Sequence, residues 1–438
     1  MSKLHRCDKV IRAFAPGLIL LAALLHPAAA WADAALDYLQ RLGRTDLKDV
    51  SSVMALADWA ERRGLARQAA EQYRRALSLD ADHDGAYQRL NKITDTHRLP
   101  DDVRRQKQVL QELRAFNPRF QLHVAPHFLV VYDTERAWAL NRAVLLEKTH
   151  DRFFKAFRSA GLRPMPLDRR LVCVLFKEHA DFTRYSKTAD QKSMAWSSGY
   201  YSGRTNRVAF FHDRSNPAFK EAMDHMAGLE ERLKVQEKKV NDPTRKRNPT
   251  LNRADRIELD RIRRELRWYR NRVSQIAART NAAKTTHEAV HQLAYNSGVQ
   301  KLGVMQPFWL VEGLATNFEV DDPSRPFGPY YDNPSRRQAL KAAANQRRLM
   351  PLAELVVMTR PGDTSKADEV TRLYAQGWGL FQFLFKKRHN DLRTYLRALR
   401  QQPPGPRDPK LLRKEFERAF GPAATVQAQF RRYIGQMK

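Results

Sequence analysis

The stretch "TTHEAVHQLAYNSG", residues 285–298, places His287 and His291 four positions apart, with Glu288 beside the first histidine. On a helix this spacing puts both imidazoles on one face, about one turn apart and within reach of a single metal ion. The carboxylate of Glu288 can then sit beside a metal-bound water and accept its proton instead of binding the metal. The stretch therefore predicts an active-site helix of the HExxH type, which requires a third ligand nearby.

A second stretch, "PFWLVEGLATNFEV" at 307–320, offers that ligand as Glu312. Pro307 can open a helix, and the preceding loop "NSGVQKLGVMQP" can reverse the chain, so that Glu312 lies alongside the two histidines. Two neutral imidazoles and one carboxylate form an open, catalytic type of Zn²⁺ site, whereas a closed structural site more often uses several cysteinates.

Cysteine is scarce in this chain, which has only Cys7 and Cys173. Cys7 lies within a predicted signal peptide, so the mature chain would have no internal disulfide. Cys173 lies in an apolar run and is interpreted as a small buried hydrophobe, not a nucleophile.

Residues 1–32 are predicted to be a secretory signal peptide. A basic start precedes the apolar run "AFAPGLILLAALL", and "AWA" at 30–32 supplies small residues for cleavage before Asp33. No later segment approaches the roughly 20 apolar residues of a membrane-spanning helix. We therefore expect an exported protein, periplasmic or extracellular, without a transmembrane segment.

The chain of 438 residues has a formal net charge of +30. Its length suggests two to three domains, and its charge favours polyanions in general. Export makes an intracellular nucleic-acid role less expected, and the absence of a phosphate-binding or dinucleotide glycine pattern implies no nucleotide cofactor.

The N-terminal region, 33–117, is predicted to be helical. Residues 50–90 pair two helical runs around Gly64 and resemble one tetratricopeptide-type helix pair. Such a pair is either a cap without a binding role or a surface for a protein partner.

Beyond Pro118 the pattern changes to short runs that are rich in β-branched and aromatic residues and typical of strands. These runs are "HFLVVY" (127–132), "RLVCVLF" (170–176), "GYY" (199–201) and "NRVAFF" (206–211). A helical run separates the first two, which predicts a small mixed or antiparallel sheet with a helix packed on it.

Residues 219–284 are highly charged, with apolar residues three and four positions apart on both sides of "NDPTRKRNPT" at 241–250. The prolines predict a break, and the simplest arrangement is an inserted antiparallel helical hairpin. The hairpin is either a partner or polyanion contact or a solvated element without a ligand. From 285 onward the pattern is that of a helical C-terminal subdomain.

At this point the sequence resembles a known family. "HEAVHQ", "PFWLVEGLATNFE" and "YAQGWGLFQFL" are similar to motifs of the peptidase MA-like gluzincins, over 118–433. The resemblance implies an α+β zincin-like fold: a small mixed sheet, an active-site helix and a helical C-terminal subdomain. It also implies Zn²⁺ bound by His287, His291 and Glu312, with Glu288 as the general base of peptide hydrolysis. The 219–284 insertion departs from the family pattern.

Two further residues complete the predicted site. Tyr374, in "YAQGW", is the candidate donor to the oxyanion, or else a core tyrosine. Glu319 lies seven residues after Glu312, hence on nearly the same face of a helix, and is expected either to orient a ligand histidine or to be solvated. Five other histidines lack metal-type spacing: His123, His127, His179, His212 and His225.

Two other classes of function stay open. One is a catalytically silent zincin that serves as an adaptor, and the other is a polyanion-binding protein of the cell envelope. The sequence does not indicate a substrate, or whether cleavage would be internal or terminal.

Overall fold

The computed structural model describes residues 33–96, 103–362 and 365–437. The predicted signal peptide, 1–32, lies outside the described residues. The chain divides into two compact units, one up to Pro100 and one from Asp101. Helix α5, Val103–Phe116, therefore belongs to the second unit, whereas the sequence analysis places the boundary after residue 117.

The first unit is helical throughout its described regular structure. Residues 33–44 form a helix, followed by α2 (Val50–Arg62), α3 (Ala66–Leu79) and α4 (Asp84–Thr96). Small buried residues, among them Ala57 and Ala69, line the contact between α2 and α3. Gly64, at φ 73°, makes the turn between them in the left-handed region that glycine tolerates. The predicted helix pair is present.

The second unit contains a mixed sheet of five strands in the order β1-β2-β3-β5-β4. The strands are β1 (Gln121–Val124), β2 (Phe128–Tyr132), β3 (Leu171–Phe176), β4 (Gly199–Ser202) and β5 (Arg207–Phe211). The three central strands are parallel, and β1 and β4 are antiparallel edges. The central strands are buried along their whole length and, apart from Arg207 at the start of β5, apolar, because helices cover both faces of the sheet.

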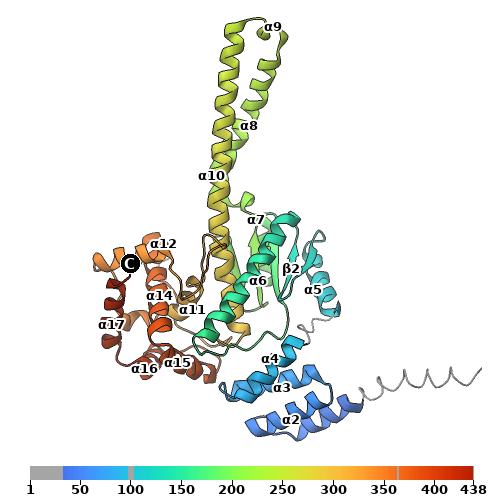
Figure 1. Cartoon of the computed structure of the whole chain (residues 1–438), viewed down its shortest axis with the longest axis vertical. Coiled ribbons are helices and arrows are strands. Elements are labelled where there is room, and N and C mark those ends of the chain that lie inside the picture. The colour runs from blue at the N-terminus through green and yellow to red at the C-terminus, as the bar shows by residue number, and fades with distance from the viewer. Residues whose placement is uncertain (1–32, 97–102, 363–364, 438) are drawn as a thin grey trace, which may run out of the picture. The chain divides into compact units, whose positions relative to one another are not determined.

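Helices cover the two faces of this sheet (Figure 1). Helices α5 and α7 (His179–Ala189) share one hydrophobic cluster with alternate residues of β2, β3 and β5. Helix α6 (Arg136–Ser159) packs against β2 and against helix α10, which also contacts β4 and β5. The predicted α+β class is confirmed, and of the two predicted sheet types the mixed one is found.

The predicted hairpin is present as α8 (Lys220–Asn241), the short α9 (Pro243–Lys246) and α10 (Pro249–Asn296). The end predicted at residue 284 is wrong. Helix α10 runs unbroken for 48 residues, from the tip of the hairpin through the HExxH residues (Figure 1). After Pro249 it contains neither proline nor glycine, so no residue interrupts the helix before Asn296.

The remaining elements form the predicted helical C-terminal subdomain. They are α11 (Phe308–Thr316), α12 (Pro334–Asn345), α13 (Leu352–Leu355), α14 (Ala367–Lys387), α15 (His389–Gln401), α16 (Pro409–Phe420) and α17 (Ala423–Gly435). The middle of α14 is buried among them. In the described part of the chain no helix has the length and apolar character needed to cross a membrane.

Candidate metal centre

The last turns of α10 hold the two histidines in a buried position. Helix α10 contacts the strands β4 and β5 and the helices α6 and α11. His287 and His291 are 9% and 8% exposed, and their Nε2 atoms lie 3.1 Å apart. The four-residue spacing therefore brings both nitrogens to one point, as predicted.

Glu312, on α11, completes a group of three possible metal ligands. Its Oε2 lies 3.1 Å from Nε2 of His287, and its Oε1 lies 3.8 Å from Nε2 of His291. One ligand atom from each residue falls within 4.8 Å of the others. Within the described residues this is the one such group, and its donor set of two imidazoles and one carboxylate suits Zn²⁺ in an open site.

Two facing glycines bring α11 close enough to α14 to place Glu312. A Cβ atom on Gly313 would lie 2.4 Å from the carbonyl oxygen of Gly377. Asn317, at the end of α11, donates from its side chain to the carbonyls of Gly313 and Trp378. The position of the third ligand thus depends on a backbone contact that no larger residue permits.

The charges in this group favour a cation at its centre. Burial alone would raise the pKa of Glu312, but His291 and His287 outweigh it and hold that pKa far below its usual range. Burial would also keep His287 neutral, but hydrogen bonds to Glu312 and Glu319 raise its pKa well above the ordinary value. The proton on His287 therefore balances the charge of Glu312 and Glu319, as a metal cation bound at the same place would.

Glu288 lies on the side of α10 that faces the sheet edge. Its Oε2 accepts a hydrogen bond of 2.8 Å from the backbone N–H of Tyr201 in β4. Burial raises the pKa of Glu288, while the two histidines act in the opposite direction. The carboxylate is thus held beside the ligand group by a backbone donor, which the sequence analysis did not foresee.

Glu319 contacts His287, as expected, but it does so from a loop and not from the helix that carries Glu312. Its Oε1 lies 3.0 Å from Nδ1 of His287. The helix ends at Thr316, so Glu319 extends from the segment after α11 and not from the same helical face as Glu312. The expectation of a shared helical face is wrong, although the side chain lies beside the expected histidine.

Arg336, at the start of α12, holds Glu319 from the other side. Its Nε and Nη2 donate to the two carboxylate oxygens at 2.8 and 2.9 Å. Its guanidinium carbon also lies 5.6 Å from the ring centroid of Tyr374. The pair Arg336–Arg337 in "PSRRQAL" carries no sequence signal for this role.

Tyr374, on α14, lies in the same cluster. Its ring centroid is 6.4 Å from that of His287 and 5.1 Å from that of Phe308. Burial, followed by the charges of Glu312 and Glu288, raises the pKa of its hydroxyl far above the usual value. The hydroxyl therefore stays protonated at ordinary pH, and a hydrogen bond to Glu312 contributes to the raised pKa.

The edge strand β4 borders the cluster, and three of its outward backbone groups already have partners. The N–H of Tyr201 donates to Glu288, and the N–H of Gly199 donates to Oγ of Ser197 at 3.3 Å. The same Ser197 hydroxyl donates to the carbonyl of Gly199. A peptide that pairs with this edge must replace these bonds.

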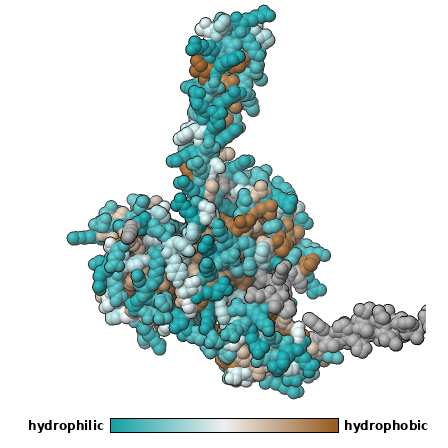
Figure 2. Space-filling view, viewed as in Figure 1, coloured by the Kyte–Doolittle hydropathy of each residue, from teal (hydrophilic) through white to brown (hydrophobic). Residues whose placement is uncertain are grey.

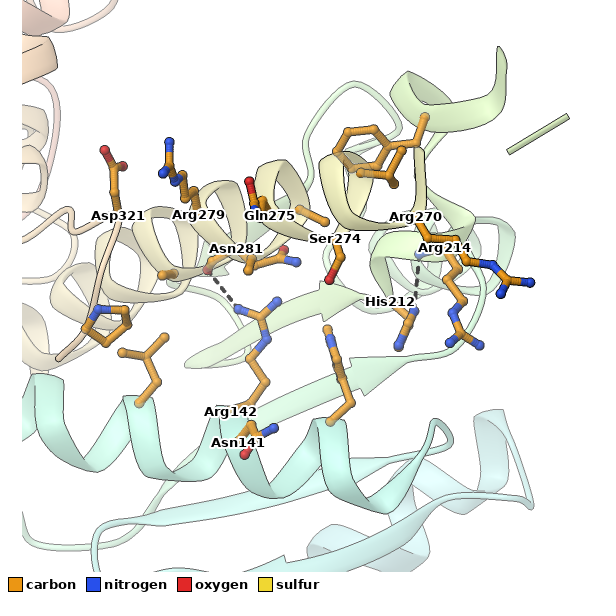
Figure 3. Close-up of a pocket in the computed structure, with 18 of the residues that line it drawn as sticks. Asn141, Arg142, His212, Arg214, Arg270, Ser274, Gln275, Arg279, Asn281 and Asp321 are labelled. Carbon is orange, nitrogen blue, oxygen red and sulfur yellow. Dashed lines mark hydrogen bonds between the residues drawn. The ribbon is translucent and has the colours of Figure 1, made fainter. Parts of the chain in front are cut away.

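A groove of about 1390 Å³ lies on a different face of α10, between α6, α8 and the loop 321–324. None of the ligand residues lines it. Arg142 extends across it from α6 and donates to the carbonyl of Asn281 at 2.8 Å (Figure 3). Arg214 and Arg270 lie toward one end of the groove in that view, and Arg279 and Asp321 toward the other. The groove is therefore separate from the candidate metal centre.

The other candidate residues stay outside this centre. His127 bonds to Glu147 at 2.6 Å and stacks on His150, with ring centroids 3.6 Å apart. Cys173 is fully buried in β3, and burial raises its pKa to about 12. A buried thiol of this kind is inert as a nucleophile.

The comparisons with known proteins locate one similarity. A family described as "Protein of unknown function (DUF1570)" matches residues 281–405. This segment contains every residue of the cluster, from His287 to Tyr374. No curated protein and no solved structure matches the chain.

Proposed function

We propose that this protein is an exported zinc-dependent metallopeptidase of the gluzincin type. The observation that carries the proposal is the convergence of His287, His291 and Glu312 beside the buried carboxylate of Glu288. The two histidines and Glu312 would hold the metal. Zinc bound there supplies Lewis-acid polarisation of the scissile carbonyl and lowers the pKa of water toward about 7.

The side chains around the ligands have separate roles in this proposal. Glu288 accepts the proton of the attacking water and returns it to the leaving amine, because it is the one carboxylate of the cluster that faces the strand edge. The hydroxyl of Tyr374 donates to the developing oxyanion. Glu319, fixed by Arg336, holds the Nδ1–H of His287, so that Nε2 is free to bind the metal.

The substrate in this proposal is an extended peptide that pairs with β4. Pairing uses the backbone of Gly199 and Tyr201, so an incoming peptide takes the Tyr201 N–H from Glu288. Substrate binding then frees the base from a hydrogen bond that favours its charged form, which makes Glu288 a stronger proton acceptor when the peptide is in place.

A catalytically silent zincin is the second candidate function, with the N-terminal helices as a surface for a protein partner. In this alternative the helix pair α2–α3 would be that surface, and its two helices pack against each other. A site kept only for structure has no need of a carboxylate at position 288, and this disfavours the silent form.

The deciding experiment compares the purified protein with its Glu288→Gln variant, by zinc content per chain and by hydrolysis of unfolded protein substrates. We expect one zinc per chain in both proteins and hydrolysis only in the parent. Zinc in both without cleavage in either would support the adaptor. A chain that binds no zinc would overturn the metallopeptidase and leave the adaptor.

A further inference from the structure

The outward face of α10 carries a row of exposed residues at helical spacing. We define the arginine stripe as Ile257, Arg261, Arg264, Trp268, Arg272, Gln275 and Arg279, all of them exposed. The steps of three and four residues keep these side chains on one side of the helix, and the row extends for about 33 Å at 1.5 Å per residue. It faces away from α8, whose contact with α10 is made by residues such as Leu229 and Leu266.

The arginines of α10 differ in whether they have an acidic partner. Those beside α8 are paired with its acids, as in Arg270 with Glu230 at 2.6 Å and Arg263 with Glu237 at 3.0 Å. In the stripe, Arg261 pairs with Glu258 of its own helix. Arg264, Arg272 and Arg279 form no ion pair with any residue in the described part of the chain. The acids of the hairpin thus neutralise its inner side and leave the stripe positive.

Large apolar side chains interrupt the stripe. Ile257 and Trp268 are each 59% exposed, on a helix whose own hydrophobic side is already buried. Figure 2 shows a few hydrophobic residues on the otherwise hydrophilic surface of the hairpin. Trp268 contacts Tyr269 edge-on, with ring centroids 4.9 Å apart, yet stays largely exposed. Exposed tryptophan among basic residues occurs on helices that lie at a membrane interface.

We propose that the arginine stripe docks this protein on an anionic lipid bilayer. The guanidinium groups contact lipid phosphates, and Trp268 and Ile257 enter the headgroup region. The row from Ile257 to Arg272 lies on the projecting part of α10, whereas Gln275 and Arg279 border the groove beside the loop 321–324. This inference concerns binding alone, so it stands whether or not the centre hydrolyses peptides.

Co-sedimentation with vesicles tests the proposal on the full chain. We expect binding to vesicles of phosphatidylcholine mixed with phosphatidylglycerol, weakening with salt, and no binding to phosphatidylcholine alone. Each arginine near an anionic surface contributes about a fivefold factor, so Arg264→Gln/Arg272→Gln/Arg279→Gln should bind roughly 100-fold more weakly. These side chains are exposed and unpaired, so the melting temperature should stay that of the parent.

The matched control removes three charges from another face of the same hairpin, as Lys234→Gln/Lys238→Gln/Lys239→Gln on α8. We expect this variant to bind nearly as well as the parent. Tryptophan emission should shift to the blue on vesicle binding in the parent but not in Trp268→Phe. Equal loss of binding in both triple variants would overturn the stripe, and so would absent binding to the anionic vesicles. Stripe-dependent binding of DNA or polyglutamate without vesicle binding would replace the bilayer by that polyanion.

Discussion

Arg336 contacts two side chains of the candidate centre, Glu319 and Tyr374, which come from different segments of the chain. Its guanidinium donates to both carboxylate oxygens of Glu319, and Glu319 in turn forms a hydrogen bond with His287. The same guanidinium lies over the ring of Tyr374. Removing such a support typically lowers metal affinity or activity by about 10–100-fold. We therefore expect Arg336→Gln to weaken zinc binding and to lower kcat within this range, with partial recovery in Arg336→Lys.

Chelator competition and steady-state kinetics measure these two effects. The neighbouring arginine supplies the control, because Arg337 on the same helix pairs with Asp332 outside the cluster. Arg337→Gln should leave zinc affinity unchanged. If both variants lose zinc equally, Arg336 acts through the stability of α12 and not through Glu319.

The stability of the protein should depend on pH because His150 is mostly buried. Burial, followed by the charge of His127, lowers its pKa to about 4 from the ordinary 6.5. Between these values the unfolded chain binds the proton and the folded chain does not. The free energy of unfolding therefore decreases as the pH falls from 6.5 to 4, by up to about 3 kcal/mol. The contribution of the neutral His150 to that free energy is complete above pH 6.5.

Thermal unfolding between pH 7 and pH 4.5 tests this dependence. His150→Phe keeps the ring contacts with His127 and Phe154 but cannot take up a proton. Its melting temperature should fall less over this range than that of the parent. The exposed His389 is the control, and His389→Gln should follow the parent. Parallel curves for all three proteins would contradict the assignment.

The residues of the centre differ in how well the sequence predicts them. Helical spacing is sufficient for His287 and His291, and the short loop after them makes Glu312 reachable. Glu319 is expected on a helix that in fact ends three residues before it. Neither Arg336 nor the N–H of Tyr201 has a local signature, because each reaches the centre through tertiary packing from a distant segment.

At the scale of elements, the contact of α11 with α14 sets the position of the third ligand. Gly313→Ala would place its Cβ 2.4 Å from a backbone carbonyl that cannot rotate away. We expect the free energy of unfolding to fall by about 1–3 kcal/mol through overpacking. Zinc affinity should fall as well, because Glu312 is the adjacent residue.

Gly228 in α8 gives a control of opposite sign. A Cβ there meets no atom within 4 Å, so Gly228→Ala should raise helix stability by up to about 1 kcal/mol. Denaturation and zinc titration of both variants measure the contrast. Unchanged zinc affinity in Gly313→Ala would show that Glu312 does not depend on this contact.

The boundaries of elements follow local signals only where such signals exist. The prolines at 243 and 249 mark the turn of the hairpin correctly, and β-branched runs mark the buried strands. No proline, glycine or other helix-ending signal occurs near residue 284, and Asn281 and Thr285 belong to the same helix. The hairpin passes into the turns of the candidate metal centre without a structural break, so a boundary at residue 284 has no structural counterpart.

At the scale of the second unit, one helix carries both the arginine stripe and two of the candidate metal ligands. From residue 270 to 280 most side chains of α10 are exposed, whereas from Asn281 onward they are mostly buried. Arg142 braces the start of the buried part, where it donates to the carbonyl of Asn281 and to the hydroxyl of Thr285. Packing therefore holds the turns with the ligands independently of the exposed span.

This division predicts the effect of a kink placed between the two parts. Ser274→Pro removes a helical N–H and crowds the carbonyl of Arg270, which costs about 3 kcal/mol locally. We expect faster hydrogen exchange at the amides around residue 274, with protection retained from Thr285 to Asn296. Zinc affinity should stay that of the parent and of the Ser274→Ala control. If zinc affinity falls together with protection of the ligand turns, the straightness of α10 itself positions His287. A contact made along the stripe would then act directly on the metal centre.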